Sequence, residues 1–159
     1  MTPDTPADVV APALVRGLAE ELESPADDAP KALEQAWSGL RTARLLGLRL
    51  STVDLMWRRR QGNAEAVEFQ LARDLGTSAT FARVDLALPM PASVVPLPAD
   101  EADAALVALI RFSAAARRHM LAAAPLAEHW HDERVLRHDS KVFGSLGEAW
   151  LGRRAGFHR

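Results

Sequence analysis

Hydrophobic side chains recur at helical spacing through residues 7–48. Two stretches carry the pattern, and a turn around Pro25 separates them. Residues four apart lie on one face of a helix, so each stretch has one apolar face and one polar face. The apolar positions are Val10, Leu14, Leu18 and Leu22 in the first stretch and Leu33, Trp37 and Leu40 in the second. The pattern predicts two N-terminal helices.

Between residues 49 and 88 the apolar positions alternate with polar ones instead. Three runs show a period of two, with breaks near Gly62 and Gly76. The alternating positions are Leu50, Val53, Leu55 and Trp57, then Val67, Phe69 and Leu71, then Ala82, Val84, Leu86 and Leu88. Side chains two apart share one face of a strand, so we expect a three-stranded antiparallel meander. The side chains expected in its core are Val67, Phe69, Val84 and Leu86.

The first of these runs has a competing interpretation. Ser51 and Asp54 have the three-residue spacing of a helix capping box, which favours a helix over residues 52–60. We prefer a strand, because the two runs that follow need a neighbour with which to pair.

Prolines mark the next segment as an extended linker over residues 89–98. Four of them occur there, at Pro89, Pro91, Pro96 and Pro98. Proline cannot donate a backbone hydrogen bond, so this stretch is unsuited to the interior of a sheet.

Residues 99–153 return to helical spacing. Pro125 divides them, so we expect a long helix before it and another over about 126–138. Ser145 and Glu148 again have capping-box spacing and predict a further short helix.

The elements together predict an α+β fold. We expect one domain of residues 1–159, with two N-terminal helices, a small three-stranded antiparallel meander and a helical C-terminal half. Residues 154–159 should form a frayed tail.

Composition narrows the function classes. The chain has 19 basic and 21 acidic residues, a net charge of −2, and no cysteine. Disulfides, thiol nucleophiles and cysteine-ligated metal sites are therefore excluded. No run of 18 apolar residues occurs, so we expect no membrane contact. The first residues are acidic and interrupted by proline, unlike a secretory signal, and we expect a cytoplasmic protein.

The densest group of metal-ligating residue types lies just beyond Pro125. Glu128 and His131 would share one helix face, as would His129 and Glu133, and imidazole with carboxylate suits zinc or iron. A di-iron bundle needs a second Glu-x-x-His motif, which the chain lacks. We therefore favour ion pairs on a solvated helix face, with a small metal-dependent enzyme as the alternative.

Other catalytic signatures are missing from the sequence. It contains neither a glycine-rich phosphate loop nor a Gly-x-Ser-x-Gly elbow. His138, Asp139 and Ser140 are the residue types of a catalytic triad, but triads assemble from distant positions, so adjacency is no signal. We expect no catalytic residue and no cofactor.

Three tryptophans and two arginines are the candidate partner-binding residues. Trp130 and Trp150 lie in charged stretches with few apolar neighbours, and tryptophan is enriched at binding hot spots. Trp57 also fits an apolar stripe, and it directly precedes Arg58 and Arg60. These two guanidinium groups would share one strand face and could bind an acidic group.

Charge is distributed unevenly along the chain. Residues 1–35 carry −6, residues 36–62 carry +5 and residues 134–159 carry +4. Such segments can pair within one chain, between two copies or with a partner. Our first hypothesis is a non-enzymatic interaction protein (an adaptor, chaperone or complex subunit) that self-associates. A nucleic-acid-binding accessory using Arg58–Arg60 and the basic tail is a further alternative, which the near-zero net charge disfavours.

Overall fold

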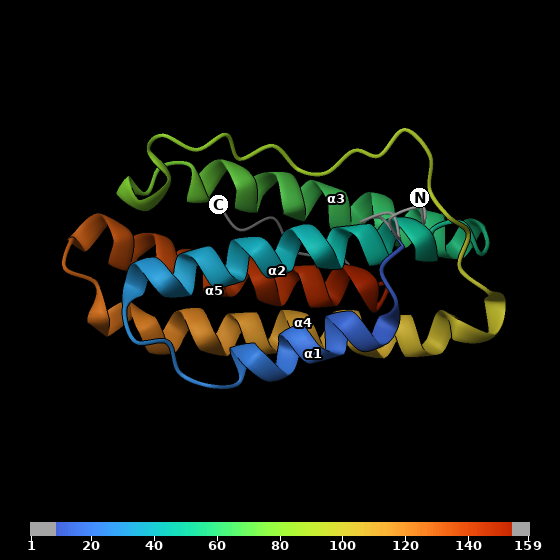
Figure 1. Cartoon of the computed structure of the whole chain (residues 1–159), viewed down its shortest axis with the longest axis horizontal. Coiled ribbons are helices and arrows are strands. Elements are labelled where there is room, and N and C mark those ends of the chain that lie inside the picture. The colour runs from blue at the N-terminus through green and yellow to red at the C-terminus, as the bar shows by residue number, and fades with distance from the viewer. Residues whose placement is uncertain (1–8, 154–159) are drawn as a thin grey trace, which may run out of the picture.

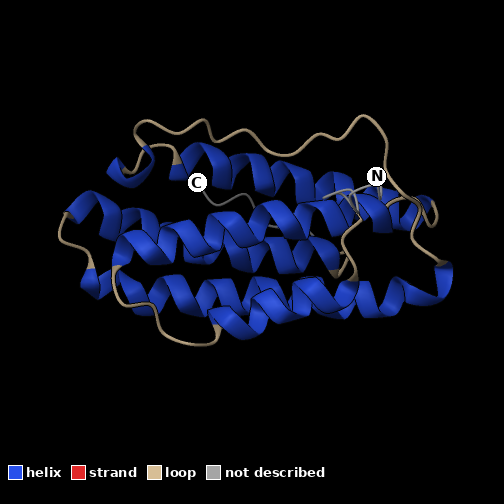
Figure 2. Cartoon of the chain, viewed as in Figure 1, coloured by secondary structure: helices blue, strands red, loops and turns tan. Residues whose placement is uncertain are grey.

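The computed structural model describes residues 9–153, and all regular structure in that range is helical (Figure 2). The five α-helices are α1 (Pro12–Leu22), α2 (Ala29–Leu50), α3 (Leu55–Leu75), α4 (Ala102–Ala123) and α5 (Trp130–Trp150). Three short 3₁₀ helices are η1 (Ala79–Phe81), η2 (Ala99–Glu101) and η3 (Ala124–Leu126). The predicted α+β class is therefore wrong, because residues 9–153 contain no strand. The predicted frayed tail, 154–159, lies outside the described residues.

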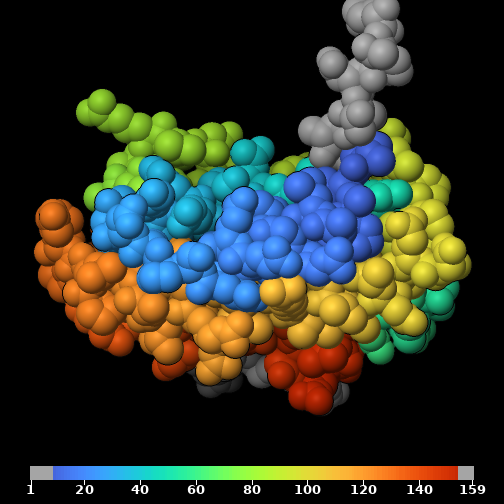
Figure 3. All heavy atoms as spheres, turned by 60° about the horizontal axis from the view of Figure 1, so that its bottom comes forward, coloured from blue at the N-terminus to red at the C-terminus, as the bar shows by residue number. Residues whose placement is uncertain are grey.

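Four long helices form a bundle (Figure 1). Around its axis α2 packs on α3, α3 on α5, α5 on α4 and α4 on α2. The shorter α1 packs mainly on α4 and also contacts α2, as Figure 3 shows from that side. No described helix is long and apolar enough to span a bilayer.

A long connection crosses the bundle between α3 and α4. These two helices run in the same direction, so the chain must return along the length of the molecule after α3 (Figure 1). It does so through residues 85–98, which form neither helix nor strand. An extended chain advances about 3.1 Å per residue against 1.5 Å in a helix, so this stretch is long enough to pass a 22-residue helix.

The predicted meander is replaced by α3 and the start of this connection. Asp54 caps α3, since its carboxylate accepts a hydrogen bond from the backbone N–H of Trp57 at 3.1 Å. The helix alternative for residues 52–60 thus describes the chain better than the strand. The buried residues of α3 follow helical spacing, and they are Trp57, Ala64, Val67, Glu68, Leu71 and Leu75.

The four side chains predicted to lie in the core of the meander differ in their burial. Val67 is buried and Leu86 is partly buried against the core, but Phe69 is 48% exposed and Val84 is 55% exposed. In a helix, Phe69 lies about 200° around the axis from Val67, so the two cannot both face the core.

Beyond Pro125 the chain forms one long helix where two shorter helices were predicted. Pro125 lies in η3 and ends α4, as expected for proline. Beyond it, α5 is continuous from Trp130 to Trp150, and Ser145 lies within it instead of capping a new helix. The Ser145 hydroxyl donates a hydrogen bond to the backbone oxygen of Lys141 one turn earlier, at 3.4 Å.

Two buried arginines of α2 hold the crossing segment. Arg44 is 2% exposed and donates hydrogen bonds to the Glu68 carboxylate at 2.8 Å and to the Pro89 backbone oxygen at 2.8 Å. Arg49 donates to the backbone oxygens of Val95, Pro96 and Val10 at 3.0, 3.2 and 2.8 Å. Burial raises the pKa of Glu68 to about 7, while the Arg44 guanidinium opposes that rise.

Two glycines of α2 let large aromatic rings approach its backbone. A Cβ on Gly39 would lie 2.6 Å from Phe112 of α4, and a Cβ on Gly47 would lie 2.5 Å from Trp150 of α5. Gly62 differs, because it is exposed in the middle of α3 with nothing within 4 Å of such a Cβ.

Gly47→Ala should therefore destabilise the fold by about 1–3 kcal/mol, because the added methyl group must displace the Trp150 ring. The matched control is Gly62→Ala, which should stabilise by about 0.5–1 kcal/mol through helix propensity alone. Urea unfolding of both variants checks the pair. Equal effects of the two changes would contradict the close approach of α2 and α5.

Arg44→Leu should cost about 3–5 kcal/mol, because Glu68 would remain buried without its cation. The double variant Arg44→Leu/Glu68→Leu should lose less than Arg44→Leu alone, since it removes the stranded carboxylate as well. Arg41→Leu, at an exposed position on the same helix, should stay within about 0.5 kcal/mol of the parent. Urea unfolding measures all three, and a smaller loss for Arg44→Leu than for the double variant would contradict a stabilising buried pair.

Candidate functional site

Three metal-ligating side chains meet between the end of α3 and the middle of α5. Asp74 comes from α3, and His138 and Asp139 come from α5. One ligand atom from each lies within 4.8 Å of the other two. His138 Nε2 lies 3.5 Å from Asp74 Oδ2, and the side-chain amide of Gln70 lies 3.5 Å from the same ring nitrogen. We call Asp74, His138 and Asp139 the carboxylate–histidine cluster.

Helix periodicity explains why an acid of this cluster is inside the protein. Asp139 follows Leu136 by three residues and precedes Phe143 by four, so it occupies the buried stripe of α5. It is 0% exposed. His138, one residue earlier, lies at the edge of that stripe and is exposed to solvent beside α3.

The Asp139 carboxyl pairs only with the carboxyl of Asp74. Among residues 9–153, the buried side-chain nitrogen and oxygen atoms that receive no hydrogen bond from an N–H or hydroxyl donor are Asp74 Oδ2 and both carboxyl oxygens of Asp139. Buried polar groups are almost always paired, so this concentration of atoms without such a donor marks the cluster as unusual. Burial, together with a side-chain hydrogen bond to Asp74 and the negative charge of Asp74, raises the pKa of Asp139 to about 10.

A pocket of about 390 Å³ opens beside the cluster. Its lining residues are Asp74, Thr77, His131, Arg134, Val135, Arg137, His138 and Lys141. Most come from α5, at spacings of three and four residues, which align them along the helix face toward the end of α3. The pocket is therefore rich in basic side chains and is lined by one carboxylate, that of Asp74.

The four residues of the alternative metal site considered from the sequence lie apart from this cluster. Glu128 precedes α5, and His129 occupies its N-cap position, so the expected helix-face pairs do not form. His131 Nε2 is 3.0 Å from the Thr77 hydroxyl, at the rim of the pocket. Glu133 accepts a hydrogen bond from Arg137 at 2.9 Å, the kind of helical ion pair that we favoured.

The predicted partner-binding tryptophans have different surroundings. Trp130 is 68% exposed, with the Arg134 guanidinium 5.4 Å from its ring centroid. Trp57 and Trp150 are 5% and 1% exposed, so both lie in the core. Partner binding at Trp130 stays a prediction.

Of the two predicted arginines, Arg60 has a structural contact. It donates a hydrogen bond to the Trp150 backbone oxygen at 3.1 Å, at the C-terminal end of α5, and its guanidinium lies 4.9 Å from the Trp57 ring centroid. A cation at a helix C-terminus is stabilising. Arg58 is exposed, and its predicted role in partner binding stays a prediction.

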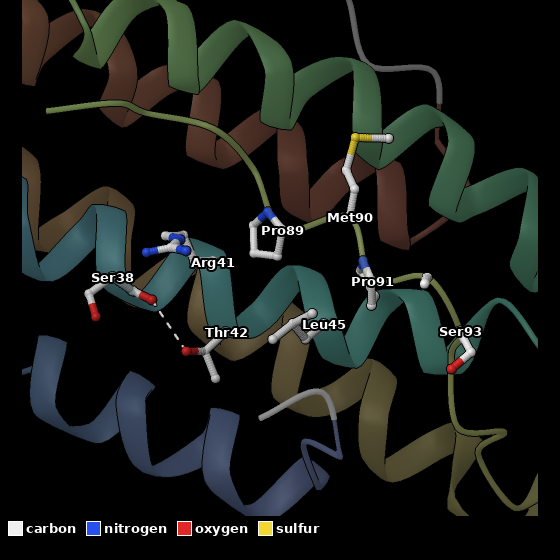
Figure 4. A pocket seen from close by; sticks show the side chains of 9 residues that line it. Ser38, Arg41, Thr42, Leu45, Pro89, Met90, Pro91 and Ser93 are labelled. Carbon is white, nitrogen blue, oxygen red and sulfur yellow. Dashed lines mark hydrogen bonds between the residues drawn. The ribbon is translucent and has the colours of Figure 1, made fainter. Parts of the chain in front are cut away.

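A larger hollow lies between α2 and the crossing segment (Figure 4). Its volume is about 720 Å³, and its lining residues are Ser38, Arg41, Thr42, Leu45, Pro89, Met90, Pro91, Ala92 and Ser93. Thr42 donates a hydrogen bond to the Ser38 backbone oxygen within it, at 3.3 Å. Arg41 is its one charged side chain, and no histidine or carboxylate lines it. We therefore place the candidate site at the carboxylate–histidine cluster.

Comparison with known proteins returns no relative. No protein family, curated protein or solved structure matches the chain. The function must therefore be argued from the arrangement of its own residues.

Proposed function

We propose that the protein binds a divalent transition-metal ion at Asp74, His138 and Asp139. The observation that carries the proposal is the fully buried Asp139 carboxyl, which receives no hydrogen bond from an N–H or hydroxyl donor and lies beside another carboxylate and an imidazole. Without a cation this carboxyl keeps its proton, and a metal ion between the three side chains would displace that proton and compensate the resulting negative charge. The site belongs to the same chemical class as the metal-dependent alternative considered from the sequence, on different residues.

The ligand types favour zinc, manganese or iron(II). Imidazole suits zinc and iron, and carboxylate oxygen suits harder ions such as manganese. Metal–ligand bonds of about 2.1 Å place tetrahedral ligand atoms about 3.5 Å apart. The three atoms, now within 4.8 Å of one another, would need to close by about 1 Å, which side-chain rotation can supply.

Three protein ligands leave one coordination position open. Structural zinc sites are closed by four protein ligands, whereas catalytic sites keep a position for water or substrate. Here the pocket beside Asp74 and His138 borders that open position. The arrangement therefore supports a site that presents its metal ion to a ligand.

The wild-type chain should bind one Zn²⁺ or Mn²⁺ per molecule, measured by isothermal titration calorimetry. At an ion concentration a hundred times the Kd, binding stabilises the fold by about 2.7 kcal/mol. For about 150 residues this corresponds to a rise of about 5–10 °C in Tm. His138→Ala and Asp139→Asn should each weaken binding at least tenfold (about 1.4 kcal/mol) and reduce that rise.

Matched controls separate this from general damage to α5. His129→Ala and Glu148→Gln change a histidine at the N-cap of α5 and an acid near its C-terminal end, both outside the cluster, and should leave the affinity unchanged. Asp139→Asn should fold, because the asparagine amide can donate a hydrogen bond to Asp74. If neither ion binds the wild-type chain, Asp74 and Asp139 share only a proton and the proposal is wrong.

A second candidate function is self-association through Trp130, in a cytoplasmic interaction protein. The observation that favours it is the exposure of Trp130 (68%) and Leu126 (50%) at one end of the bundle, where η3 leads into α5. Large exposed apolar side chains that lie together are typical of interfaces. The opposite charges of residues 1–35 and 134–159 would favour pairing between two copies.

Trp130→Ala should weaken association by about 2 kcal/mol or more and leave Tm unchanged, because the side chain is exposed. Leu55→Ala, which truncates a 58%-exposed leucine at the opposite end of the bundle, is the control and should not change association. Sedimentation equilibrium at several concentrations gives both results. A wild-type chain that is monomeric at every concentration would overturn self-association.

A further inference from the structure

We propose that the pocket beside the carboxylate–histidine cluster binds the phosphate group of a small phosphomonoester, which contacts the metal ion on one side and Arg134 and Lys141 on the other. This inference rests on the proposed metal site and adds the class of ligand that the site takes. Its basis is the charge and the spacing of the residues that line the pocket.

Basic side chains of α5 form a row beside the cluster. His131, Arg134, His138 and Lys141 follow one another at intervals of three, four and three residues, which keeps them on one helix face. All four line the pocket. The row therefore runs past the metal ligand His138, with Arg134 one turn before it and Lys141 one turn after it.

The ion pairs of the pocket determine which cations can receive a ligand. Glu133 accepts hydrogen bonds from Arg137 at 3.2 and 2.9 Å, which compensates that charge. Arg134 and Lys141 form no ion pair with any residue of the described chain. These two charges can therefore bind an external anion.

The net charge of the metal-loaded pocket favours a ligand with two negative charges. A divalent metal ion neutralises the carboxylates of Asp74 and Asp139, and this leaves the two positive charges of Arg134 and Lys141. A phosphate group carries about −1.5 to −2 at neutral pH, whereas a carboxylate carries only −1. Arginine also binds phosphate oxygens through two parallel hydrogen bonds, and clamps of arginine, lysine and a metal ion are used on phosphoryl groups.

The size of the pocket favours a small molecule over a polymer. Its volume of about 390 Å³ lies in the range of small-ligand sites, about 300–1,000 Å³. Phosphate fills part of that space and leaves room for the group to which it is esterified. Val135 gives this remaining part of the lining an apolar side chain.

The test titrates inorganic phosphate, phenyl phosphate and acetate into the full-length chain by calorimetry. The chain is first loaded with one equivalent of whichever of Zn²⁺ and Mn²⁺ binds more tightly, then desalted. We expect both phosphates to bind at one site, and acetate to bind at least tenfold more weakly. Without metal, phosphate binding should weaken by a similar factor.

Lysine substitutions give a matched control, because the chain has only two lysines, Lys31 and Lys141. Lys141→Met should weaken phosphate binding about tenfold while metal affinity stays unchanged. Lys31 lies on α2, at the surface, and is paired with Asp27. Lys31→Met should change neither the phosphate affinity nor the metal affinity. Arg134→Gln should act like Lys141→Met.

The outcomes separate this inference from the proposed function. If the metal binds and phosphate does not, or if acetate binds as tightly as phosphate, the inference is overturned and the metal site stands. If phosphate binds equally well to the metal-free chain, the inference is also overturned, because the metal would make no contact with it. If no metal binds the wild-type chain, both proposals fail together.

Discussion

The guanidinium groups of Arg44 and Arg49 hold the one long connection of this fold against the bundle. Because α3 and α4 run in the same direction, the chain between them must cross the full length of the molecule. Residues 85–98 make this crossing without a neighbouring strand, so their backbone carbonyls need other partners. Arg44 reaches Pro89, and Arg49 reaches Val95 and Pro96. Arginine suits this role because it has several donors and no acceptor.

Elsewhere in the interior, buried polar groups have specific partners. Arg44 faces Glu68, and Ser78 donates a hydrogen bond to Asp132 at 2.8 Å. His119 Nδ1 lies 3.0 Å from the Leu22 backbone oxygen, which can only accept, so that nitrogen carries a proton. Asp139 is the contrast, because its buried carboxyl has only a second carboxyl, that of Asp74, with which to pair. This contrast supports the proposal that the cluster binds a metal ion.

The helical parts that could be predicted from the sequence are those with one apolar stripe. The helix α1 and the helix before Pro125 needed only local spacing, although Leu14 of the predicted stripe is 52% exposed and the buried residues of α1 are Val15, Ala19 and Leu22. The strand prediction over the residues of α3 is wrong because Phe69 lies on the outer surface of this helix. The Arg44 guanidinium is 6.0 Å from the Phe69 ring centroid. Taken with Val67 and Leu71, Phe69 imitates the alternation of a strand, although Ala64, Val67, Leu71 and Leu75 already follow helical spacing.

The strand predicted over residues 82–88 is wrong for a different reason. Leu86 and Leu88 face the bundle while Asp85 and Ala87 are exposed. An extended chain packed along a helical surface has the same period of two as a strand, because its side chains alternate in the same way. A hydrophobic period of two therefore indicates an extended backbone with an apolar surface on one side. It cannot distinguish a strand of a sheet from a single extended segment packed on a helical bundle.

The candidate site could not be predicted from the sequence, because its geometry depends on the connection between α3 and α4. Asp74 and Asp139 come together only when α3 and α5 are adjacent, and Asp139 appears buried only when α5 is one continuous helix. The chain leaving α3 helps to fix this arrangement, since Ser78, four residues after Asp74, is hydrogen-bonded to Asp132 in the first turn of α5. That bond anchors the end of α3 beside the start of α5. It therefore holds Asp74 opposite His138 two turns further along, so the fold itself brings the three side chains of the carboxylate–histidine cluster together.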